Sequence, residues 1–242
     1  MTNGVLLLTF DDIFVPEWST ARELFAAHDA RVSFFVSALD RLTPADWPLL
    51  RELAADGHTV GAHGLRHLNA AERVAEVGSD AYLRDEVDPC VAGLRAEGLD
   101  PRTFAYPYSA RSETSDALLT KVFTRLRGGL SVPEGRELAD IGDFFVPVAE
   151  LPERRILIGA GADNGAQHQP RGNSDAMLLG GLRRAAERGE VFTLIAHAIA
   201  DTHEHNYIAP ARIDWLLTQA AELGLRCLGF DDLPEAGSLI TG

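Results

Sequence analysis

The chain has 242 residues, enough to bury one large α/β core or two small ones. Apolar residues make up 46% and charged residues 24%, the proportions of an ordinary soluble globular protein. The formal net charge of −14 argues against nucleic acid or an anionic membrane as the main partner, because either would need a basic face. The two cysteines, Cys90 and Cys227, match no metal or redox spacing.

The amino terminus has no basic region. Its apolar run, residues 5–8, is too short for a signal peptide or a membrane span. We therefore expect a cytoplasmic protein that does not insert into a membrane. The sequence does not indicate an oligomeric state.

Segments typical of strands and of helices alternate from one end of the chain to the other. In chain order we expect a strand at 5–10, a helix at 19–28, a strand at 32–37, a helix at 44–55, a strand at 58–62, a helix at 79–97, a strand at 102–106, a helix at 115–126, short strands at 144–146 and 156–158, a helix at 174–188, a strand at 191–196, a helix at 210–223 and a strand at 225–230. No repeat and no long linker divides the chain, so residues 1–242 are expected to form one domain. The alternation predicts a single-domain, distorted (β/α) barrel of about seven parallel strands with surrounding helices.

Polar residues follow four of the expected strands. Asp11 and Asp12 end the first strand, and His63 follows the third. A Tyr106-Pro107-Tyr108 segment ends the strand at 102–106, and His197 ends the strand at 191–196. The carboxyl ends of all strands in a parallel barrel open on one face, where active sites lie. These four clusters are therefore expected to converge.

The spacing of two histidines points to a metal. His63 and His67 are four residues apart, which would place both imidazoles on one face of a helical turn. The pair would face Asp11 and Asp12 at the neighbouring strand end. Two histidines and one carboxylate, with positions left for water, are the pattern of a catalytic divalent metal.

Four short motifs together resemble those of the polysaccharide deacetylases, the NodB-type carbohydrate esterases. The motifs are Thr9-Phe10-Asp11-Asp12, His63-x-x-x-His67, Phe104-Ala105-Tyr106-Pro107-Tyr108 and Leu194-Ile195-Ala196-His197. The likeness extends over about residues 5–233. It implies a distorted (β/α) barrel and hydrolysis of an N-acetyl group on an amino sugar. It also implies one divalent ion, with zinc expected and cobalt, nickel, manganese or iron(II) as alternatives.

The resemblance also assigns roles to individual residues. Asp12, His63 and His67 match the metal ligands. Asp11 matches the general base that takes a proton from water, and His197 matches the general acid that protonates the leaving amine. The backbone N–H of Tyr108 would help to stabilise the oxyanion.

Two positions depart from the family pattern. Gly64 stands where a serine or threonine usually ties down the metal-binding loop, and this could loosen that loop. Ala105 stands where an arginine is frequent, so another arginine is expected to steady the base. Arg155 is the candidate, with Arg154 as an alternative, and the two also fit an ordinary surface arginine pair.

Several readings stay open. The substrate expected of a cytoplasmic enzyme is a small nucleotide-linked or lipid-linked amino sugar, or an antibiotic-type glycoside. The alternatives are an allantoinase-type or cyclic-imide hydrolase acting on a non-sugar C–N bond, and a barrel that binds metal but serves as a regulatory module. His168, His203 and His205 have no assigned role. A second Phe-Asp-Asp stretch, Asp231 and Asp232 included, is expected on the same barrel face but as a turn or helix cap.

Overall fold

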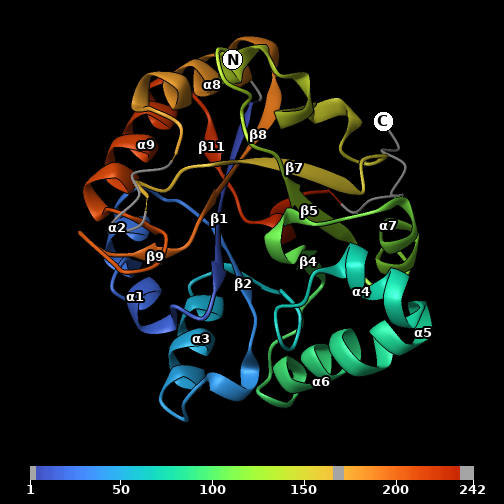
Figure 1. Cartoon of the computed structure of the whole chain (residues 1–242). Helices are drawn as coiled ribbons and strands as arrows, with labels where there is room; N and C mark the ends of the chain where they lie inside the picture. Colours follow the sequence, from blue (N-terminus) through green and yellow to red (C-terminus); the bar gives the residue numbers. More distant parts are fainter. Residues whose placement is uncertain (1–3, 166–171, 235–242) are drawn as a thin grey trace.

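The computed structural model describes residues 4–165 and 172–234. Seven parallel strands form a closed barrel at the centre of the molecule (Figure 1). The ring closes because β1 pairs with β2 on one side and with β8 on the other. In ring order the strands are β1 (Val5–Asp12), β2 (Ser33–Val36), β3 (Thr59–Ala62), β4 (Thr103–Ala105), β5 (Arg125–Gly129), β7 (Ile156–Gly161) and β8 (Glu190–Ala196). The predicted single-domain (β/α) barrel is confirmed.

Four further strands lie outside this ring. β6 (Phe145–Pro147) runs antiparallel to β8, and β11 (Arg226–Cys227) pairs with the amino end of β1. β9 (Ala198–Ile199) and β10 (Tyr207–Ile208) form a small separate sheet. Because β9 follows β8 directly, this small sheet lies next to the carboxyl end of the barrel.

Helices surround the barrel and connect successive strands (Figure 1). They are α1 (Val15–Ser19), α2 (Arg22–Ala27), α3 (Asp46–Ala55), α4 (Ala70–Val77), α5 (Ser79–Tyr82), α6 (Asp88–Ala96), α7 (Glu113–Leu119), α8 (Asp175–Arg188) and α9 (Pro210–Glu222). Local sequence fixes their ends. Ser174 caps α8 by accepting a hydrogen bond from the Met177 backbone N–H, and Gly189 ends that helix in the left-handed conformation (φ 65°). Within the described residues, no helix is both long and apolar enough to cross a membrane.

The alternation of side chains along β1 explains how the barrel presents a carboxylate. Leu6, Leu8 and Phe10 pack into the main apolar cluster beneath the helices. Leu7 belongs to a second, smaller cluster inside the barrel. Because successive strand residues point to opposite faces, Asp11 lies on the same inner face as Leu7. It is therefore buried, with 4% of its surface exposed.

One strand was assigned wrongly from the sequence. We expected a helix through residue 126, but α7 ends at Leu119 and Arg125 begins β5. The capping box of Ser112 and Ser115 starts this helix at Glu113, two residues earlier than expected. The short strand expected at 144–146 is present as β6, and it runs antiparallel to β8 outside the barrel.

Candidate metal centre

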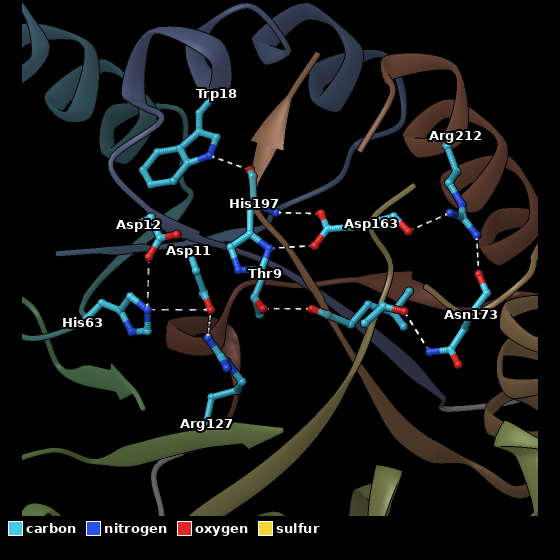
Figure 2. Close-up of polar contacts among 12 residues, drawn as sticks. Thr9, Asp11, Asp12, Trp18, His63, Arg127, Asp163, Asn173, His197 and Arg212 are labelled. Carbon is cyan, nitrogen blue, oxygen red and sulfur yellow. Dashed lines mark hydrogen bonds and ion pairs between the residues drawn. The ribbon is translucent and has the colours of Figure 1, made fainter. Parts of the chain in front are cut away.

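Asp12 occupies an unusual backbone conformation where β1 ends. Its φ of 87° lies in the left-handed region, which side-chain-bearing residues seldom adopt. This turn breaks the strand alternation, so Asp12 and the inward-facing Asp11 both lie near His63 (Figure 2). Strain of this kind is found at functional sites.

His63 and His67 lie on a loop between β3 and α4, not on the helical turn predicted from their spacing. Gly64 (φ 82°) and His67 (φ 60°) bend this loop so that the two imidazoles meet, with their Nε2 atoms 3.2 Å apart. The Nδ1 of His63 lies 2.8 Å from the Ala105 carbonyl oxygen, to which it donates when Nε2 is unprotonated. Burial lowers the pKa of His63 to about 4, so its Nε2 lone pair is free at neutral pH.

The three side chains fit a divalent ion. The Oδ1 of Asp12 lies 3.6 Å from the Nε2 of His63 and 3.2 Å from the Nε2 of His67. Ligands about 2.0–2.2 Å from one tetrahedral ion are separated by roughly 3.3–3.5 Å, so these distances match zinc geometry. Among the residues that the structure describes, no other group of three histidine, cysteine or carboxylate side chains is arranged to hold a metal.

Asp11 is paired with an arginine that the sequence analysis missed. Arg127, in the middle of β5, donates a hydrogen bond to the Oδ2 of Asp11 inside the barrel (Figure 2). Burial opposes the ionisation of Asp11, but Arg127 and His197 hold its pKa below the usual value. The other oxygen, Oδ1, is buried and has no hydrogen-bond partner among the described residues. Asp11 is therefore an ionised carboxylate with one oxygen free to accept a proton.

The prediction that Arg155 steadies this base is wrong. Arg155 immediately precedes β7, and its guanidinium donates to the carbonyl oxygens of Thr120 and Phe123. Arg154 pairs instead with Glu150. Strand β7 begins at the amino end of the barrel, whereas Asp11 lies toward the carboxyl end, so neither arginine is near it.

His197 is held by a carboxylate that the sequence analysis left unassigned. The Oδ2 of Asp163 lies 2.6 Å from the Nδ1 of His197, and its Oδ1 accepts the His197 backbone N–H (Figure 2). The indole Nε1 of Trp18 donates to the His197 carbonyl oxygen. Burial alone would lower the pKa of His197, but the charge and hydrogen bond of Asp163 raise it to about 9. The imidazole is therefore protonated at neutral pH.

Two clefts meet at this site. One, of about 650 Å³, is lined by residues that include Asp12, His67 and Arg41, and the other, of about 600 Å³, includes Asp163. Tyr108, His197 and Asn206 line both clefts. Tyr108 is 71% exposed, has a left-handed backbone (φ 57°) and packs its ring against His67. Both clefts are of a size that takes a small molecule.

The structure describes two of the three histidines that had no role assigned from the sequence. The rings of His203 and His205 contact Phe14, with centroid distances of 5.1 and 5.9 Å, and His205 lines the first cleft. His168 lies outside the described residues.

The second Phe-Asp-Asp stretch does not share the barrel face of the metal centre. The backbone N–H groups of Phe230 and Asp231 bind the hydroxyls of Ser33 and Thr59, which begin β2 and β3. The expectation of a shared face is therefore wrong, since these strands begin at the opposite end. The predicted turn is correct: Phe230–Asp232 form a 3₁₀ turn, and Asp232 caps it at Gly229.

The geometry agrees with a comparison of the sequence with known families. The sequence profile described as polysaccharide deacetylase matches residues 1–124. The chain belongs to the polysaccharide deacetylase family. The family recognised from the four sequence motifs is thereby confirmed.

Three solved structures share the fold at low sequence identity. The catalytic domain of peptidoglycan N-acetylglucosamine deacetylase from Eubacterium rectale ATCC 33656 is 15% identical, with a TM-score of 0.54 over 99% of this chain and 94% of that one. A polysaccharide deacetylase from Bacillus cereus is 14% identical, with a TM-score of 0.55 over 94% and 92%. A CE4 family pseudoenzyme from Bacillus anthracis is 14% identical, with a TM-score of 0.59 over 95% and 65%.

A curated sequence relative is much longer than this chain. The gellan lyase of a Bacillus species is 30% identical over 131 residues, which is 54% of this chain and 5% of that protein. The chain thus spans only a small part of the length of this relative. None of the relatives named here supports the cyclic-imide alternative.

Proposed function

We propose that the chain is a metal-dependent N-deacetylase that releases acetate from an N-acetylated amino sugar. The observation that carries this proposal is that two titratable groups beside the Asp12–His63–His67 cluster, Asp11 and His197, are held in opposite charge states. Arg127 keeps Asp11 ionised, and Asp163 keeps His197 protonated. A pair of titratable groups whose pKa values are driven apart in this way supplies a base and an acid at one pH.

An amide is a weak electrophile with a poor leaving group, so both ends of the reaction need assistance. Asp12, His63 and His67 would hold one divalent ion, with zinc the best match to their nitrogen and oxygen donors. Such an ion, when bound, polarises a carbonyl group and lowers the pKa of water to about 7. The remaining steps depend on the side chains of this protein.

Asp11 acts as the general base. Its unpaired Oδ1 accepts a proton from the attacking water while Arg127 holds Oδ2 in place. The oxygen of that water then bonds to the acyl carbon. The backbone N–H of Tyr108 donates to the developing oxyanion, a contact typically worth about 3 kcal/mol of barrier reduction.

His197 acts as the general acid. Asp163 occupies its Nδ1, which leaves the Nε2 proton for the leaving nitrogen as the C–N bond breaks. The products are acetate and a free amine. After release, Asp11 gives up the proton it accepted and His197 regains one from solvent.

The clefts favour a substrate with groups on both sides of the acetamido nitrogen. Tyr108 and His197 lie where the two clefts join, so a sugar held there has room to continue in either direction. A nucleotide-linked, lipid-linked or glycosidic amino sugar, or a segment of a glycan, satisfies this description. The nearby charged and polar side chains, which include Asp40, Arg41 and Glu204, suit a polyhydroxylated ligand.

The proposal is tested by an acetate-release assay on zinc-loaded protein. N-acetylglucosamine derivatives that carry groups on O1 or O4 are expected to yield acetate and a free amine. Turnover of cyclic ureides or imides, with no acetate from any acetylated sugar, would support the cyclic-amide alternative instead. Binding of acetylated sugars without turnover would support a regulatory module.

A further inference from the structure

The loop that carries His63 and His67 has no regular structure of its own. Residues 63–69 connect β3 to α4 without a helix or strand, and two of them have positive φ values. A short segment in that conformation holds two side chains in register only if other parts of the fold fix its backbone. Gly64 offers no side chain for this purpose.

A single carboxylate from another element fixes this backbone. Glu86 is 1% exposed, and its Oε1 accepts the backbone N–H groups of Arg66 at 2.8 Å and Leu68 at 3.3 Å. The backbone carbonyl of Glu86 accepts the N–H of Leu65 at 3.1 Å. Three hydrogen bonds from Glu86 therefore fix the backbone on both sides of His67, at residues 65, 66 and 68.

The charge of this buried carboxylate is balanced within the same loop. The Nε of Arg66 lies 3.1 Å from the Oε2 of Glu86, and the Arg66 guanidinium also donates to the Asp85 carbonyl oxygen. A buried carboxylate without a cation or hydrogen bonds would be costly, so these partners account for its presence. Both oxygens of Glu86 are committed to residues 66–68.

A side chain at position 64 would collide with the Glu86 carboxylate in its present place. A Cβ atom added at Gly64 would lie 2.8 Å from the Oε1 of Glu86, closer than Cβ contacts normally occur. The positive φ at Gly64 adds to the cost of any side chain there. Because position 64 is a glycine, the Glu86 carboxylate has room to reach the loop.

The helical segment around Glu86 is itself irregular. Residues Leu83–Val87 form a π-helical turn that joins the end of α5 directly to the start of α6. Such wide turns inside α-helices are frequent at functional sites, because they shift the direction of one or two side chains. Here the wide turn contains Glu86.

We infer that Glu86 is a positioning residue for the metal centre, replacing a side chain at position 64 as the anchor of the loop. It touches no ligand atom; it sets the backbone of residues 65–68 and through it the place of His67. This inference rests on the metal site proposed above. It does not depend on which substrate the enzyme takes.

The test compares two variants of nearly equal volume. Glu86→Gln keeps an oxygen that accepts from Arg66 and Leu68, whereas Glu86→Met keeps the bulk and removes the acceptor. Glu86→Met is expected to weaken zinc affinity by roughly 10–100-fold, measured by competition with a chelator, and to alter the visible absorption spectrum of bound Co²⁺. Glu86→Gln is expected to retain the zinc affinity and the Co²⁺ spectrum of the wild-type protein. Asp85→Asn, which alters a partly exposed neighbour paired with Arg84, is the matched control and should change neither.

Wild-type zinc affinity in a folded Glu86→Met protein would overturn the inference. If wild-type protein bound no zinc, the proposed metal site itself would fall, which is a different result. Should Glu86→Met not fold, hydrogen exchange in metal-free wild-type protein decides the question. The amides of Arg66 and Leu68 are expected to be protected without metal, and exchange as fast as in exposed turns would contradict the role of Glu86.

Discussion

Arg127, in the middle of β5, donates a hydrogen bond across the barrel interior to Asp11 on β1, and both side chains are almost fully buried. The two residues are 116 positions apart in the sequence. Phe35 packs against the same guanidinium, 5.5 Å from its carbon to the ring centroid. This pair determines whether Asp11 is charged, and with it the ability of the site to accept a proton.

Removal of the Arg127 guanidinium is expected to shift the acidic side of the pH–activity profile to higher pH. In Arg127→Met the Asp11 carboxylate loses the main charge that lowers its pKa while its burial remains. Its pKa then rises, so activity is lost at a higher pH as the solution is acidified. The pH dependence of kcat/KM measures this shift. Arg155→Met, at the arginine that the sequence suggested, should leave the acidic limb in place, and an equal shift in both variants would contradict the pairing.

Substitutions at Asp11 and at His63 distinguish the loss of the general base from the loss of the metal. Asp11→Asn removes the base but none of the three ligands, so zinc content is expected to persist while kcat falls by about 10²–10⁴-fold. His63→Ala removes a ligand and is expected to lose the metal. Elemental analysis beside the acetate assay distinguishes the two. Near wild-type turnover in Asp11→Asn would show that another group takes the proton.

The loss of activity on the basic side of the pH profile is assigned to deprotonation of His197. This residue must be protonated to act as an acid, and its pKa is raised to about 9, so activity is expected to fall as pH rises through about 9. Asp163→Asn removes the charge that raises this pKa, and the limb should move down toward the ordinary histidine value of about 6.5. Asp175→Asn is the control, because Asp175 pairs with Arg212 at the surface and does not touch His197. A basic limb that stays near 9 in Asp163→Asn would contradict the assignment.

His205 is expected to affect substrate binding alone. It lines the first cleft beside Phe14 but has no contact with Asp11 or with the three ligands. His205→Ala should therefore raise KM several-fold for a substituted amino sugar and leave kcat nearly unchanged. A fall in kcat at unchanged KM would instead place His205 in the chemical step.

Sequence reasoning located the residues at strand ends more reliably than those within strands. Asp11, Asp12, His63 and His197 follow apolar runs, and parallel topology brings such ends together, as the barrel confirms. Arg127 was missed because residues 125–126 were assigned to a helix. As a strand, Arg125-Leu126-Arg127 alternates two buried arginines with a leucine, which indicates an inward-facing charge in need of a partner.

Asp163 and Glu86 depend on tertiary contacts that no local pattern reports. Asp163 follows β7 in an irregular stretch of glycines and polar residues, and its role comes from the pairing of β7 with β8, which brings it to His197. Glu86 falls in an expected helix, where a glutamate is ordinary. Its positioning role depends on the open space beside Gly64, through which its carboxylate reaches the backbone of residues 66 and 68. The second Phe-Asp-Asp stretch shows the converse, because similar local sequence lies at the opposite end of the barrel.

The most direct measurement is acetate release by the full chain before and after removal of bound metal, with zinc content determined on the same samples. Protein carrying one zinc per chain is expected to release acetate from a substituted N-acetylglucosamine, to lose this activity on chelation, and to regain it when one equivalent of zinc is returned. Acetate release that persists at zero metal content, or a zinc-loaded protein that releases none from any acetylated amino sugar, would contradict the proposed function.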